Sequence, residues 1–226
     1  MRKLTVTFVL ILGLLIANVA RATNYRTLTL PDLNVDISTW SDGWRYNTVI
    51  PGIQTWNGVK FSLASDADHH NVYMGNLTIH VNVFGVTKAY TIINSSFGNS
   101  GTNVGSIEFF GTNSAYYKMN LVEGINVRDH YDGYYCNEID GKNAIPAFTG
   151  GYYEARLDMQ IYTLPEIFSH NMLQSIKFNY DPKGYGGNPF IAAATVEANP
   201  VPIPSALYLL APGLLGLVGF KRKYLG

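Results

Sequence analysis

The residues best suited to chemistry lie in one polar stretch, from Arg128 to Gly141. This stretch is dense in carboxylates and amides, the hard oxygen ligands that Ca²⁺ binds in sets of about six to eight. The candidate calcium ligands are Asp129, Asp132, Glu138 and Asp140. Their spacing does not match the Asp-x-Asp-x-Asp-Gly calcium loop, so a solvated acidic loop with Asp-Gly turns is favoured over a bound ion.

The same stretch could contact a sugar. Tyrosine rings offer flat faces for the apolar side of a sugar, and neighbouring polar groups can bond to its hydroxyls. The candidate ligand loop therefore comprises Arg128, Asp129, His130, Tyr131, Asp132, Tyr134 and Asn137. Tyrosines that alternate along strands are usually packing residues, so only the loop tyrosines favour binding.

Two other features give weaker signals. The run from Asp66 to His70 contains two aspartates and two histidines, but no further His or Cys pair completes a zinc site, which favours a solvated loop. Cys136 is the only cysteine in the sequence, so no disulfide can form within the chain. A partly buried thiol is the expected state of this residue.

The motifs of common enzyme classes are missing from the sequence. It lacks His-Glu-x-x-His, Gly-x-Ser-x-Gly and a Gly-Lys-Ser/Thr phosphate loop. His130 follows Asp129, but no nucleophile is evident for such a pair to activate. A glycosidase needs only two separated carboxylates, so that activity stays open. The sequence nevertheless favours a protein without catalytic activity.

Strands must position these residues, because apolar and polar side chains alternate with a period of two along most of the chain. The alternation predicts strands at 59–63, 77–83, 87–93, 106–110, 117–121, 153–161 and 176–180. The apolar run 190–196 predicts a further strand, either buried on both faces or the final, central strand of a sheet. Only Pro165–Phe168 resembles a helical turn. We expect one all-β domain at 23–199, folded as an antiparallel two-sheet sandwich.

Both ends of the chain predict export. Residues 1–22 have a basic start, an apolar centre and small residues at Ala20 and Ala22, which predicts a signal peptide cleaved after Ala22. Residues 200–226 contain an apolar run of 16 residues at 205–220. A membrane helix needs about 20 residues, so this run is short, but it lacks polar positions at helical spacing and we expect it to enter the membrane.

The parts of the C-terminal segment follow a recognisable order. The tetrapeptide Val201, Pro202, Ile203 and Pro204 precedes the apolar run, and the basic residues Lys221, Arg222 and Lys223 follow it and should stay cytoplasmic. This order resembles the PEP-CTERM sorting signal of exosortase-processed bacterial envelope proteins, in a Val-Pro-x-Pro variant. The common signal has Glu at the position of Ile203. The resemblance implies an exosortase partner, a transient membrane anchor, cleavage near the motif, and delivery to the envelope or an extracellular polysaccharide matrix.

The central region also resembles a group of uncharacterised exported proteins that bear this signal. The resemblance rests on the strand order and on segments 121–130 and 189–196. It implies a jelly-roll sandwich of the galactose-binding-like kind. For sugar binding it gives a hint only, because these motifs have no established chemistry.

Charge narrows the range of partners. The chain has 16 basic and 16 acidic residues, but six basic and no acidic residues lie in the two terminal segments, which leaves 10 against 16 between them. A net acidic domain argues against nucleic acid as a partner. We expect a non-enzymatic envelope or matrix protein that binds extracellular polysaccharide. A self-assembling structural protein is the main alternative, and a polysaccharide-modifying enzyme is the third.

Overall fold

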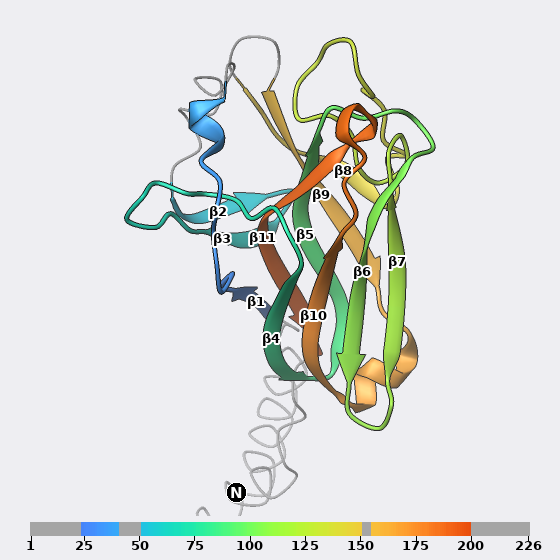
Figure 1. The fold of residues 1–226 in the computed structure, drawn as a ribbon. Coiled ribbons are helices and arrows are strands. Elements are labelled where there is room, and N and C mark those ends of the chain that lie inside the picture. Colours follow the sequence, from blue (N-terminus) through green and yellow to red (C-terminus); the bar gives the residue numbers. More distant parts are fainter. Residues whose placement is uncertain (1–23, 41–50, 151–154, 200–226) are drawn as a thin grey trace, which may run out of the picture.

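The computed structural model describes residues 24–40, 51–150 and 155–199. Strands dominate this part of the chain, and every pairing between neighbouring strands in its sheets is antiparallel (Figure 1). The all-β prediction is thereby confirmed. No helix within the described ranges has the length and apolar character needed to cross a bilayer. The expected signal peptide, sorting motif, apolar run and basic cluster all lie outside the described residues.

The strands form two main sheets and a hairpin. The larger sheet has five strands, in the order β1 (Asn24–Leu28), β11 (Asn188–Ala198), β5 (Val86–Ser96), β9 (Ala155–Thr163) and β8 (Ala144–Gly150). The smaller sheet has four, in the order β4 (Leu77–Phe84), β10 (Met172–Tyr180), β6 (Asn103–Gly111) and β7 (Tyr116–Val122). The hairpin pairs β2 (Gly52–Trp56) with β3 (Val59–Leu63). Three short 3-10 turns complete the described elements: η1 (Ile37–Thr39), η3 (Glu166–His170) and η4 (Gly184–Gly186).

The main core lies between the two sheets. Alternating side chains of the smaller sheet, such as Ile79, Ile107 and Ile176, are buried in one cluster with residues of the larger sheet, such as Ile93 and Val196. Each fully buried side chain of this size contributes roughly 1.5–3 kcal/mol relative to an exposed one. The apolar positions of the period-two pattern are therefore the positions buried between the two sheets.

A second core covers the other face of the larger sheet. Phe61 of β3 and Ile37 of η1 pack in one buried cluster with Leu157 of β9 and Phe190 of β11. Strand β11 consequently has apolar neighbours on both faces, and residues from Pro189 to Val196 are all buried. This confirms the prediction made from the apolar run.

The alternation in the sequence did not predict three of the described strands, β1, β2 and β8. Strand β8 contains Pro146, which removes a backbone donor, and it lies at the edge of the larger sheet, where proline is tolerated. The predicted helical turn corresponds to η3, which begins one residue later than expected because Pro165 is its N-cap.

Candidate functional site

The long connection from β7 to β8, residues 123–143, is held against one face of β9. Three alternate residues of that strand, Arg156, Asp158 and Gln160, are buried although they are polar. The Gln160 side chain shows why, because its Nε2 donates to the carbonyl oxygens of Ile93 at 2.7 Å and Asn126 at 3.0 Å. The polar side chains of β9, which alternation alone would place in solvent, thus bind the connection that covers them.

Arg128 forms a buried ion pair rather than a free ligand contact. Its Nε and Nη2 donate to the two carboxylate oxygens of Asp158 at 2.8 and 2.7 Å. Asn94 donates to the same carboxylate at 2.7 Å, and the Asp158 side chain is fully buried. Since its donors are used in this way, Arg128 fixes the loop and is poorly placed to hold a sugar, contrary to the sequence-based expectation.

Arg156 fixes the middle of the same loop. Its Nε donates to the carbonyl oxygen of Asp129 at 2.9 Å, and Nη2 donates to the carbonyl of Tyr131 at 3.0 Å and to the side-chain oxygen of Asn137. Burial and the neighbouring charge of Arg128 lower the pKa of this guanidinium. The side-chain oxygen of Asn137 therefore already accepts a hydrogen bond from the protein.

The next two candidates, Asp129 and His130, are buried as well. Oδ1 of Asp129 accepts hydrogen bonds from the backbone N–H groups of Phe97 at 3.1 Å and His130 at 2.9 Å. The His130 ring packs at 5.0 Å from Trp40, in an edge-to-face arrangement. The expectation of a solvated loop is wrong at these two positions, because β9 and the loop after β5 supply partners for the polar groups of this stretch.

The four candidate calcium ligands do not form one site. Asp132, Glu138 and Asp140 are exposed, whereas Asp129 is buried. Partial burial alone would raise the pKa of Asp140, but backbone donors, among them the N–H groups of Lys142 and Asn143, outweigh it and lower the pKa. Asp140 thus shapes a turn, and no three of these carboxylates come close enough to share an ion.

One group of metal-type ligands does converge among the described residues. Asp66, Asp68 and His70 place ligand atoms within 4.8 Å of one another. The two aspartates are exposed, and Nδ1 of His70 already lies 2.8 Å from Oδ2 of Asp66. This arrangement agrees with the solvated loop that the sequence favours, since the two carboxylates are exposed and the polar groups bond to one another.

Aromatic side chains gather at one end of the sandwich. Phe97, Tyr134, Tyr135 and Tyr185, named here the aromatic cluster, come from the loop after β5, the 123–143 connection and η4. The Phe97 ring centroid lies 4.9 Å from that of Tyr135 and 5.2 Å from that of Tyr185. Tyr134 is 96% exposed and Tyr185 is 72% exposed. The cluster therefore presents two large aromatic faces to solvent.

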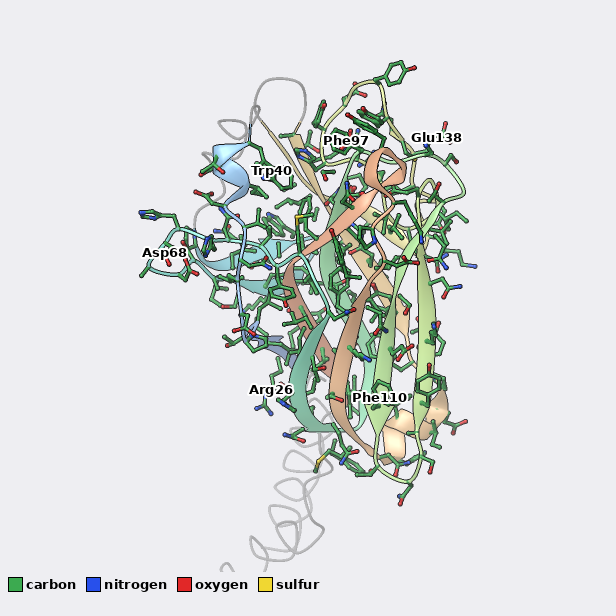
Figure 2. All side chains as sticks on the ribbon, in the orientation of Figure 1. Arg26, Trp40, Asp68, Phe97, Phe110 and Glu138 are labelled. Carbon is green, nitrogen blue, oxygen red and sulfur yellow. The ribbon has the colours of Figure 1, made fainter. Side chains whose placement is uncertain are left out.

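The backbone beneath the aromatic cluster is strained. Phe97 has φ of +66°, a conformation that is rare for a bulky residue. The hydrogen bond from its N–H to the buried Asp129 carboxylate holds it there. Figure 2 shows Phe97 and Glu138 at the same end of the molecule, opposite Arg26 and Phe110. Backbone strain of this kind is often found at functional sites, which makes this end the candidate ligand-binding end.

Comparison with known proteins adds nothing to this geometry. No family model matches the chain, and no curated protein is significantly similar to it.

A buried acid lies directly below the aromatic cluster. Glu123, the first residue after β7, is fully buried, and neither carboxylate oxygen has a hydrogen-bond partner among the described residues. Burial raises the pKa of Glu123 to about 8, the charge of Asp129 adds to this rise, and the nearby Ser95 hydroxyl offsets only part of it. Cys136 lies in the same region as a free, buried thiol whose pKa is also raised by burial.

Sequence reasoning missed Glu123, Phe97 and Tyr185. The two aromatic residues lie in Gly-rich turns far from the 128–141 stretch, and only the fold brings them to the loop tyrosines. One feature of the sequence could have indicated that Glu123 is unusual. It is a lone carboxylate between a strand and a glycine, in a segment where the flanking strand residues are apolar.

Proposed function

We propose that this chain is an exported envelope or matrix protein that binds an extracellular polysaccharide through the aromatic cluster. The observation that carries the proposal is the exposure of Tyr134 and Tyr185 on a base that is fixed by buried polar contacts. Exposed aromatic rings on a rigid base lose little conformational freedom on binding, and their faces suit the C–H side of a sugar ring.

The surroundings of the cluster suit a polar ligand. Asp132 and Glu138 are exposed in the same connection and can accept hydrogen bonds from sugar hydroxyls. Arg128 and Arg156 are bonded to protein groups, so they serve as supports for the loop. In this arrangement the tyrosines supply contact area, the carboxylates supply orientation, and the arginines hold the geometry.

The strand order supports the finer fold assignment. Without β8, the larger sheet has the order β1-β11-β5-β9 and the smaller has β4-β10-β6-β7, which is the arrangement of a jelly roll with the β2–β3 hairpin inserted after its first strand. Loops of a sandwich gather at its two ends, and loops at such ends often carry binding sites. We infer that the aromatic cluster is such a site.

The terminal signals supply the cellular context of the proposal. A signal peptide at 1–22 and a PEP-CTERM-like tail at 200–226 would bring the domain into contact with secreted polysaccharide. No catalytic step is proposed, because the exposed groups at this end are suited to contact and orientation alone.

The test compares two ends of the molecule. The full chain, purified in mild detergent, is run by affinity electrophoresis in gels that contain the polysaccharide of the producing cells. The double variant Tyr134→Ala/Tyr185→Ala should lose about 2 kcal/mol or more of binding free energy, roughly 30-fold in affinity, if both rings are hot spots. Tyr116→Ala is the control, because Tyr116 is 50% exposed and packs beside Phe110 at the opposite end. No retardation of the wild type, or equal retardation of the double variant, would refute the proposal.

A further inference from the structure

Exposed apolar side chains gather at the end of the sandwich opposite the aromatic cluster. Phe84, the last residue of β4, and Met172, the first residue of β10, are both exposed. They are direct partners in the antiparallel register, so their side chains lie next to each other. Ile167 of η3 is also exposed and lies at the same end of the molecule (Figure 1). These three residues are named here the apolar patch.

Hydrogen bonds join the turns around the apolar patch into one surface. The N–H of Gly85, in the turn between β4 and β5, donates to the carbonyl oxygen of Asn171 at 3.2 Å. The N–H of Thr112, in the turn between β6 and β7, donates to the carbonyl oxygen of Met172 at 2.9 Å. The patch is therefore contiguous, and contiguous exposed apolar groups mark interaction surfaces more often than scattered ones do.

Few charges interrupt this surface. The turn 112–115 and the segment 164–171 contain no lysine or arginine, and their one carboxylate is that of Glu166. Phe110 and the half-exposed Tyr116, whose ring centroids lie 5.3 Å apart, extend the apolar character across the smaller sheet. Because charged groups are the costliest to remove from water, this end of the domain can leave water at little cost.

The chain enters and leaves the described domain at the same end. Asn24, the first residue of β1, pairs with Ala198, the last residue of β11. The N–H of Asn199 donates to the carbonyl oxygen of Gly85 at 2.9 Å. The chain therefore leaves β11 beside the residue that follows Phe84, next to the apolar patch.

The path from this end to the expected membrane segment is short. Only residues 200–204 lie between Asn199 and the apolar run 205–220. A chain of that length spans at most about 20 Å, even when it is fully extended. An anchored chain must therefore hold the apolar patch close to the bilayer, which makes the membrane surface the occupant that this patch can always reach.

We propose that the apolar patch rests in the surface layer of the membrane while the C-terminal run is inserted. Its side chains would enter the boundary between headgroups and acyl chains, where apolar protein faces are buried to roughly 5–10 Å. Figure 2 places Phe97 and Phe110 at opposite ends of the molecule, so the aromatic cluster would face away from the membrane. The proposal rests on the membrane tail of the proposed function, but it does not depend on polysaccharide binding.

The experiment places a fluorescent probe at either end of the full chain. A dye that is sensitive to polarity is attached at His170→Cys, between Ile167 and Met172 in the sequence, or at Glu138→Cys at the opposite end, in a Cys136→Ala background. The His170 side chain is 75% exposed, so a dye there does not disturb the core. Each protein is reconstituted into nanodiscs whose lipids have a nitroxide quencher just below the headgroup. We expect a blue shift and strong quenching of the dye at 170, and neither change at 138.

A patch variant separates contact with the membrane from mere proximity to it. Phe84→Ser/Met172→Ser retains the tail and should abolish most of the quenching and the blue shift at 170. Ile53→Ser is the matched control, because it removes an exposed apolar side chain from the β2–β3 hairpin and should leave both signals unchanged. Ile167→Ser provides the measurement if the double variant shows no cooperative melting.

Several results would overturn the proposal. Quenching that is absent at 170 in an inserted chain, equal at both probes, or undiminished in a folded patch variant would each refute the contact with the membrane. A chain that does not enter nanodiscs would refute the membrane tail and this contact together, whereas insertion without quenching refutes the contact alone. A dimer in detergent that the patch variant cannot form, detected by sedimentation, would assign the surface to a second copy instead.

Discussion

The two acidic regions of this domain differ in what surrounds their carboxylates. Asp66 and Asp68 lie in an exposed loop, where Asp66 accepts hydrogen bonds from the N–H groups of Asp68 and His70. Glu123 lies below the aromatic cluster, fully buried and without a hydrogen-bond partner in the described part of the chain. The exposed residues Asp66 and Asp68 have, with His70, the spacing of metal ligands. The buried Glu123 is the residue whose carboxylate lacks a hydrogen-bond partner among the described residues.

The difference shows that the number of carboxylates in a stretch of sequence is a poor guide to a binding site. Solvent and local turns can satisfy any number of exposed carboxylates at little cost. A single buried carboxylate without a partner costs far more, because the charged form loses its hydration. Asp158 provides an internal reference for the second case, since it is equally buried but is bonded to Arg128 and Asn94.

Replacement of the paired buried acid should have the largest effect. Asp158→Asn removes the negative charge that Arg128 faces and leaves that guanidinium buried without its counter-ion. We expect a loss of about 3–5 kcal/mol of unfolding free energy, measured by urea denaturation. A loss below about 1 kcal/mol would mean that water reaches Arg128 and that the pair is not a buried one.

Replacement of the unpaired acid, Glu123, should have the opposite sign. Burial raises the pKa of Glu123 in the folded protein to about 8, above its ordinary value of 4.5. The folded protein then holds a proton that the unfolded chain releases, so stability falls as pH rises from about 4.5 and reaches its minimum above about 8. Glu123→Gln should remove this slope and stabilise the protein by up to about 5 kcal/mol at pH 8.5, since one unit of pKa shift is worth about 1.4 kcal/mol. Denaturant melts from pH 5 to 9 measure both effects. A wild-type profile without a slope in this range would contradict the prediction.

A methyl group placed against the buried acid should cost somewhat less. Gly187→Ala puts a Cβ 2.4 Å from Glu123 and 2.8 Å from a methyl carbon of Val104, at a φ of +127°. We expect a loss of about 2 kcal/mol or more. Gly52→Ala is the matched control, because its φ of +116° is close to that of Gly187 but no atom lies within 4 Å of its added Cβ. An equal loss in both variants would show that backbone strain alone is responsible.

The exposed group should give the smallest effect. Asp66→Asn removes an exposed charge and keeps an oxygen that can accept the same backbone hydrogen bonds. Its Tm should agree with that of the wild type within the error of replicate melts. A clear shift in Tm would mean that the Asp66–His70 contact does more than the exposure of its groups implies.

Much of the fold could be predicted because it follows from one-dimensional periodicity. The strands that the alternation predicts are strands in the structure: Val59–Leu63 matches β3 in full, whereas β10 begins at Met172, four residues before the predicted start at Ile176. The missed strands are short edge or hairpin strands, where fewer side chains are buried and the pattern is weak. Strand β9 shows most clearly what periodicity cannot predict. Arg156 and Asp158 have the spacing of solvent-facing residues, but the 123–143 connection covers them.

The site was harder to predict because its parts are far apart in the chain. Tyr134 was expected at a ligand site and is exposed there, but Arg128 and Asn137 are bonded inside the protein. Phe97 and Tyr185 join the tyrosines only through the meeting of three loops. Spacing along the sequence does not indicate which loops will contact one another, nor which carboxylate will be buried.

The place of β11 in the sheet also affects when the domain can fold. This strand, Asn188–Ala198, lies between β1 and β5, and β1 has no other partner in the larger sheet. A ribosome or an export channel releases the chain from its N-terminus, so both neighbours emerge long before the strand that joins them. The pairing of Asn24 with Ala198 then waits for nearly all of the described sequence. A chain that stops before residue 188 would lack the strand that joins β1 to β5, so we expect truncated products to be degraded rather than to accumulate as folded fragments.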